Sequence, residues 1–145
     1  MAIYPIQQTE GSPAHFQYGA VEGNHYLSGT SDALTNTPGA ANYIVGGNWF
    51  ITGSAIDAVT LALPVSGGGW YGASGATFPT LTGQNGVMLT FVSKTAFAHT
   101  ITTPANGING SKHIATFTAA AGNGLTLLAD SGVWWVISTI GVTLS

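Results

Sequence analysis

The stretch NGVMLTFVSKTAFAHTIT, residues 85–102, decides the fold class of this chain. Its first half is a short apolar run after an Asn-Gly pair, which is typical of a β-strand. Its second half, extended as a strand, places Phe97, His99 and Ile101 on one face and alanine and threonine on the other. The stretch therefore predicts two β-strands, with one titratable imidazole on an apolar face.

Short strands of this kind continue through most of the chain. Runs such as DAVTLALP, HIATFTA, GLTLLAD and VWWVIST are separated by turn pairs, among them Asn106-Gly107, Asn109-Gly110 and Asn123-Gly124. A strand about every ten residues, with no helical periodicity, predicts an all-β sandwich or jelly roll. VMLTFVS and VWWVIST are apolar on both faces, so we expect one face of each to meet a neighbouring chain.

The first 43 residues read differently from the rest. They are broken by prolines and glycines and keep no regular period, so we expect an irregular N-terminal arm over residues 1–43 and a β-sandwich domain over residues 44–145. A solvated tail would be poor in aromatic residues. The arm is rich in them, and we expect it to become ordered against a neighbouring subunit or a larger surface through Tyr4, Phe16, Tyr18 and Tyr26.

The charge content excludes several classes of partner. Charged residues make up 5% of the chain, against about 25% in ordinary soluble domains. Lys94 and Lys112 are its only basic residues apart from histidine, too few to neutralise nucleic acid phosphates or an anionic membrane surface. A surface with so little charge suits burial by other subunits and predicts a homo-oligomer. The alternative is a neutral but soluble surface of uncharged polar residues.

No pattern in the sequence predicts catalysis or a cofactor. The five acids are scattered singly and fit turn chemistry, although a hydrolase would need two of them to converge. The histidines lack metal-ligand spacing and cysteine is absent, so we expect no metal and no cofactor. For His99 two interpretations stay open: a neutral core imidazole with its N–H bonded to a backbone carbonyl, or a residue on a trimer axis.

Aromatic residues give two further candidates for contacts. Trp134 and Trp135 are adjacent in a strand and must face opposite ways, so at least one belongs in the core. Trp70 and Tyr71 lie in the glycine-rich segment of residues 65–86. We expect these two side chains to form a contact surface, either on a glycan or on protein.

Residues 44–145 resemble a tailed-phage structural family. The resemblance is carried by Ala96 to Thr102, a strand of the form A-h-A-H-T-h-T, and by a closing pattern made of Gly124, Thr126, Leu128, Trp135, Ser138, Gly141, Thr143 and Ser145. Members of this family are head decoration (cement) proteins or small fibre-like modules. The arm is not covered by the resemblance.

The resemblance implies an all-β homotrimer on the virion, without enzymatic activity. It implies a protein that is assembled in the host cytoplasm, binds the major capsid protein and stabilises the phage head. The chain has no long repetitive stalk, which favours a compact capsid-bound trimer over a fibre. The alternative function is a glycan- or receptor-binding module of a virion fibre or spike.

Overall fold

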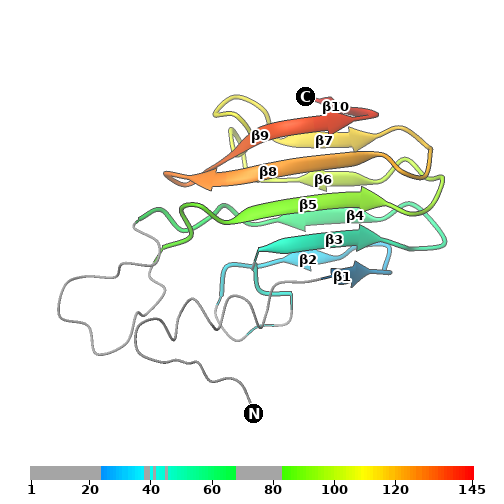
Figure 1. The fold of residues 1–145 in the computed structure, drawn as a ribbon, viewed down its shortest axis with the longest axis horizontal. Coiled ribbons are helices and arrows are strands. Elements are labelled where there is room, and N and C mark those ends of the chain that lie inside the picture. The colour runs from blue at the N-terminus through cyan, green and yellow to red at the C-terminus, as the bar shows by residue number, and fades with distance from the viewer. Residues whose placement is uncertain (1–23, 38–39, 41, 45, 68–82) are drawn as a thin grey trace, which may run out of the picture.

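The structure, a computed structural model, describes residues 24–37, 40, 42–44, 46–67 and 83–145. The regular secondary structure of these residues is all β, which confirms the predicted class (Figure 1). Among the described residues no helix is long and apolar enough to cross a membrane. Five predicted contact residues lie outside the described part of the chain: Tyr4, Phe16, Tyr18, Trp70 and Tyr71.

Within the described residues, the strands form two mixed sheets of five strands each. Sheet A contains, in spatial order, β1 (Asn24–Leu27), β3 (Gly47–Ile51), β5 (Met88–Ser93), β8 (Gly124–Asp130) and β9 (Val133–Ile140). Sheet B contains β10 (Val142–Leu144), β7 (Ile114–Phe117), β6 (Thr100–Thr102), β4 (Ala58–Leu61) and β2 (Ala33–Leu34).

The first six strands form a stack of coils. The chain alternates between the sheets from β1 to β6, and both β1–β3–β5 and β2–β4–β6 are parallel. Each coil is one sheet A strand, a turn and one sheet B strand. Strands β7 to β10 then add to the same sheets in antiparallel order. The parallel pairings were not predicted, and they distinguish this arrangement from a jelly roll, whose strands are antiparallel.

The strands begin earlier than the sequence analysis expected. β1 and β2 lie within the segment predicted as an irregular arm, and each pairs with the next coil. The reason is apolar burial: Leu27 and Leu34 are almost fully buried, and the His25 ring stacks on Trp49 with centroids 4.3 Å apart. Residues 24–34 therefore belong to the sheets, and the remainder of the predicted arm before residue 24 lies outside the description.

A single hydrophobic core lies between the two sheets. Alternate residues of every long strand point into it, as the period of two requires. Sheet A contributes Trp49, Phe91 and Leu127, and sheet B contributes Ile101 and Phe117. The prediction for the tryptophan pair is confirmed, because Trp134 has no exposed surface whereas Trp135 is 43% exposed.

Two of the predicted Asn-Gly turns use asparagine at positive φ. Asn106 has a φ of 62° and Asn109 a φ of 51°, a region that asparagine tolerates better than most residues. Asn109 also protects the edge of sheet A, because its side-chain oxygen accepts a hydrogen bond from the Val136 backbone N–H at 2.9 Å.

Candidate functional site

The candidate interaction surface is the outer face of sheet A, the face turned away from the core. Strand register arranges its side chains in three rows that run across the strands, along the direction in which the coils stack. The first apolar row contains Tyr26, Phe50, Val92, Gly124 and Ile140. The polar row contains Asn24, Asn48, Thr90, Thr126 and Ser138. The second apolar row contains Met88, Leu128 and Trp135.

Large apolar side chains on this face are exposed to solvent. Tyr26 is 60% exposed, Met88 47% and Ile140 66%. Ile137 stands at the β-bulge of β9, opposite no residue of β8, and it is also exposed. Strand β9 thus carries apolar side chains on both faces, as its sequence predicted. Large apolar side chains exposed on one face and accompanied by polar residues are typical of a protein interaction site.

The polar row contains only amides and hydroxyls. The Asn48 side-chain N–H donates to the Asn24 side-chain oxygen at 3.2 Å, and the Thr90 and Thr126 hydroxyls are 3.4 Å apart. Each of these groups both donates and accepts hydrogen bonds. The row can therefore pair with another row of the same composition without burying a charge.

Charges of opposite sign lie at the two margins of this face. Lys94 follows β5 beyond the first apolar row, with Nζ 5.3 Å from the centroid of the Phe50 ring. Asp130 ends β8 beyond the second apolar row, where its carboxylate is exposed and accepts from the Ser131 hydroxyl. A basic margin and an acidic margin thus border an uncharged surface.

A second candidate is the buried polar cluster at the turns that lead from sheet A to sheet B. Turns 52–57 and 94–99 stack in register, which places His99 over Asp57. The Asp57 backbone N–H donates to His99 Nδ1 at 3.0 Å. Nδ1 must then be the acceptor, so the neutral ring carries its proton on Nε2 and donates to the Thr95 hydroxyl, 2.9 Å away. Because that nitrogen holds the proton, His99 cannot act as a base toward Thr95.

Two acids that looked unrelated in the sequence meet in the same cluster. The Asp57 carboxylate accepts the Asp32 backbone N–H at 3.1 Å, and the Asp32 carboxylate accepts the Gly29 N–H at 2.9 Å. Burial raises the pKa of Asp57 to about 6, and the negative charge of Asp32 also raises it. The second carboxylate oxygen of Asp57 is buried without a partner. Asp57 has no exposed surface, so the pair joins turns rather than facing a substrate.

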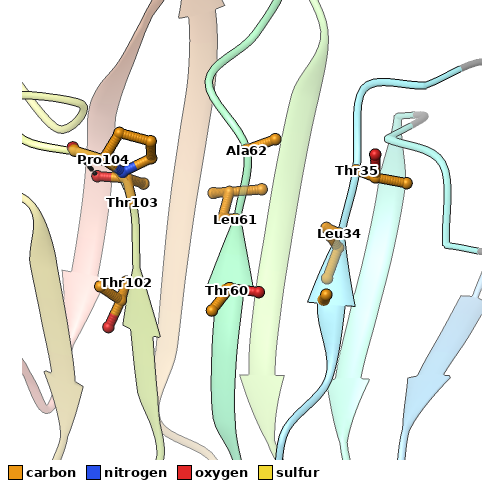
Figure 2. A pocket seen from close by; sticks show the side chains of 9 residues that line it. Leu34, Thr35, Thr60, Leu61, Ala62, Thr102, Thr103 and Pro104 are labelled. Atoms are coloured by element: carbon orange, nitrogen blue, oxygen red, sulfur yellow. Dashed lines mark hydrogen bonds between the residues drawn. The ribbon is translucent and has the colours of Figure 1, made fainter.

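A shallow hollow of about 450 Å³ lies over the carboxyl ends of the parallel strands β2, β4 and β6 (Figure 2). The pairing of β4 with β6 ends at Thr60 and Thr102, and Pro104 has no backbone N–H with which to extend it. Its lining is uncharged: Ala33, Leu34, Thr35, Thr60, Leu61, Ala62, Thr102, Thr103 and Pro104. None of these side chains has a buried polar atom without a partner.

The structure describes two of the predicted contact residues. Tyr26 lies on the first apolar row and stacks on Phe50 with centroids 5.7 Å apart. His99 is fully buried with both ring nitrogens bonded inside the chain, so it offers no surface to a trimer axis. Its Nδ1 accepts a backbone N–H, whereas the sequence analysis expected a donor to a backbone carbonyl. Within the described ranges no three histidine or acidic side chains are grouped to hold a metal ion.

The chain matches no protein-family model and no curated protein.

Proposed function

We propose that this chain is a structural protein of a tailed-phage virion, a decoration (cement) protein that binds the major capsid protein as a homotrimer and stabilises the head. The observation that carries the proposal is the outer face of sheet A, on which Tyr26, Met88, Trp135 and Ile140 stand exposed on a chain with almost no charge. Exposure of these apolar side chains to water is unfavourable, and a protein partner that covers them removes this free-energy cost.

The chemistry of the described residues supports a structural role. The hydroxyl and imidazole of Thr95 and His99 are in contact, but the tautomer prevents proton abstraction from the hydroxyl. The convergent acids Asp32 and Asp57 accept backbone N–H groups of the turns they join. These polar groups stabilise the fold, as a protein that works by contact area requires.

The capsid contacts the surfaces of the trimer that are not used for contacts between copies of the chain. The outer face of sheet B presents small side chains, mainly Ala58, Thr60, Thr100, Thr116 and Thr143, and carries no charge on its strands. A flat face of hydroxyl and methyl groups can pack against another protein by area and hydrogen bonds. Binding of this kind should depend little on ionic strength, because salt screens charges.

Labelling of native particles tests the proposal. An antibody raised against the purified chain is applied to density-gradient particles from cells that produce the chain, and the particles are imaged by electron microscopy. We expect label on the heads. Label confined to a tail fibre or spike would replace the proposal by a receptor-binding module, and particles without label would overturn it.

A further inference from the structure

We infer that the outer face of sheet A is the surface through which copies of this chain join, with the Lys94 margin of one copy against the Asp130 margin of the next. The inference rests on the trimer of the proposed function and names its contact. It follows from the order of the rows, from the chemistry of the polar row and from the signs of the two margins.

The order of the rows favours a copy of the same chain as the partner. Across the face, the sequence of surfaces is basic margin, apolar row, polar row, apolar row and acidic margin. The rows run along the coil stack, so a three-fold axis parallel to the stack lies parallel to every row. With the polar row nearest that axis, the first apolar row of each copy meets the second apolar row of its neighbour.

The polar row of one subunit can pack against the polar rows of other subunits without electrostatic repulsion. A row of lysines or carboxylates would repel the same row of another subunit, whereas asparagine, threonine and serine each supply donors and acceptors. Asn48, Thr90 and Thr126 from three copies can therefore hydrogen-bond around the axis. The two pairs already formed within the chain show that neighbouring members of the row are within bonding reach.

The two margins carry charges of opposite sign and lie at similar heights along the coil stack. Lys94 follows β5 and Asp130 ends β8, and these strands are neighbours in sheet A. Their heights along the stack therefore differ by one strand spacing, about 4.8 Å. A three-fold rotation preserves height, so it brings the Lys94 of one copy beside the Asp130 of the next. Within one chain the two residues are about 26 Å apart, because Asp130 lies opposite Gly86, eight residues from Lys94.

The size of the face agrees with a stable contact. Five strands at about 4.8 Å and three rows at about 6.7 Å give roughly 500 Å² of projected area per copy. Side-chain relief makes the accessible area larger, which approaches the roughly 800 Å² that each partner buries in a standard interface.

Disulfide trapping tests the pairing, and the absence of cysteine from the chain makes it unambiguous. A variant with Lys94→Cys and Asp130→Cys is oxidised with oxidised glutathione and analysed on a non-reducing gel. The separation of about 26 Å forbids a bridge within one chain. We expect covalent species of two and three chains and none larger. The control pair, Thr60→Cys with Thr143→Cys on sheet B, should stay single-chain.

A second measurement tests the apolar rows. Trp135→Thr with Ile140→Thr changes one residue of each apolar row and should raise the dissociation constant of the oligomer at least tenfold, since Trp135 is 43% exposed and Ile140 66% exposed in the single chain, and both would be buried in the contact. Ile56→Thr, at an isoleucine that is 53% exposed in turn 52–57, is the matched control and should leave the constant unchanged. Far-ultraviolet circular dichroism confirms that each variant is folded.

The outcomes separate this inference from the proposed function. A wild-type chain that sediments as a monomer overturns the inference, as does a covalent ladder beyond three chains or one that stops at two. Assembly weakened by Ile56→Thr and not by the β9 variants also overturns it. A trimer trapped through Lys94 and Asp130 that labels no virion leaves the inference standing and overturns the proposed function.

Discussion

The Asp57 backbone N–H donates a hydrogen bond to Nδ1 of His99 at 3.0 Å, and this single bond joins two consecutive turns of the coil stack. The Asp57 carboxylate continues the connection to the preceding turn through the Asp32 N–H. Three turns of the stack are thus connected through Asp57 and His99, and the side chains of both residues have no exposed surface. The stability of the stack should depend on these groups.

Removing the imidazole should destabilise the chain strongly. His99→Ala leaves the Asp57 N–H buried without a partner and opens a cavity, so we expect a loss of about 2 to 4 kcal/mol in the free energy of unfolding. His113→Ala is the control, because that side chain is exposed, and should change it by less than about 0.5 kcal/mol. Urea unfolding measures both. Equal effects of the two substitutions would refute a structural role for His99.

Asp57 should make stability depend on pH in a definite direction. Its pKa is about 6 in the folded chain and 3.8 in the unfolded chain. The folded state therefore holds the proton more tightly, and the contribution of Asp57 to stability is greatest below about pH 4, falls as the pH rises toward 6 and is constant above that. Asp32 is the charged group that faces Asp57, and it acts in the same direction. The total loss is at most about 3 kcal/mol.

The comparison with Asp57→Asn isolates this effect. Burial lowers the pKa of His99, so His99 contributes stability above pH 6.5 that is lost as the pH falls below it, opposite in direction to Asp57. His99 is present in both proteins, and the part of its contribution that does not depend on the Asp57 charge cancels in their difference. We expect the unfolding free energy of the wild type relative to Asp57→Asn to decrease between pH 4 and pH 6.5. A difference independent of pH would contradict the assignment.

The alternation of apolar and polar residues was enough to predict strands after residue 44, but not β1 and β2, and it did not predict which strands pair. A period of two places side chains on faces, and it does so equally in parallel and antiparallel sheets. One signal of the coils is present in the sequence: NHYLSG at residues 24–29 and NWFITG at residues 48–53 match in their asparagine, aliphatic, hydroxyl and glycine positions, and β1 pairs with β3 in that register. In the third coil the corresponding residues, 90–95, read TFVSKT. They lack the asparagine and the glycine of the first two coils, so the repeat is hard to recognise in the sequence.

The buried cluster was predictable only in part. His99 was found from its place on an apolar face, because an unpaired imidazole there needs partners. Its partners come from a different turn, and the meeting of Asp32 with Asp57 depends on how the coils stack. Spacing along the chain does not encode such a contact, since the two acids are separated by 25 residues. The sequence VWWVIST was enough to predict that β9 has an apolar face outside the core. The three rows of the outer face of sheet A were not predictable, because they depend on the register of all five strands.

Gly53 should be required for the close approach of the stacked turns. A Cβ added there would lie 2.8 Å from the Gly29 carbonyl oxygen, a backbone atom that cannot rotate away. Gly53→Ala should therefore cost about 1 to 3 kcal/mol, as overpacking does. Ser54→Ala, at the exposed next position, is the control and should be close to neutral. Thermal unfolding compares the two, and equal melting temperatures would mean that the turns separate at no cost.

Asn109 should protect the free edge of sheet A, and Asn106 provides a matched control. Both have positive φ, which glycine adopts without strain, so replacement by glycine keeps the turn and changes flexibility equally at both positions. Only Asn109 has a side chain that accepts the Val136 N–H on the edge strand β9. Asn109→Gly should therefore be less stable than Asn106→Gly by about 1 kcal/mol, the usual net contribution of one hydrogen bond. An uncovered edge also pairs with other chains, so Asn109→Gly should aggregate faster in light scattering at equal concentration. Equal stability and equal aggregation of the two variants would show that the backbone bonds of residues 107–109 to Trp134 protect this edge without the side chain.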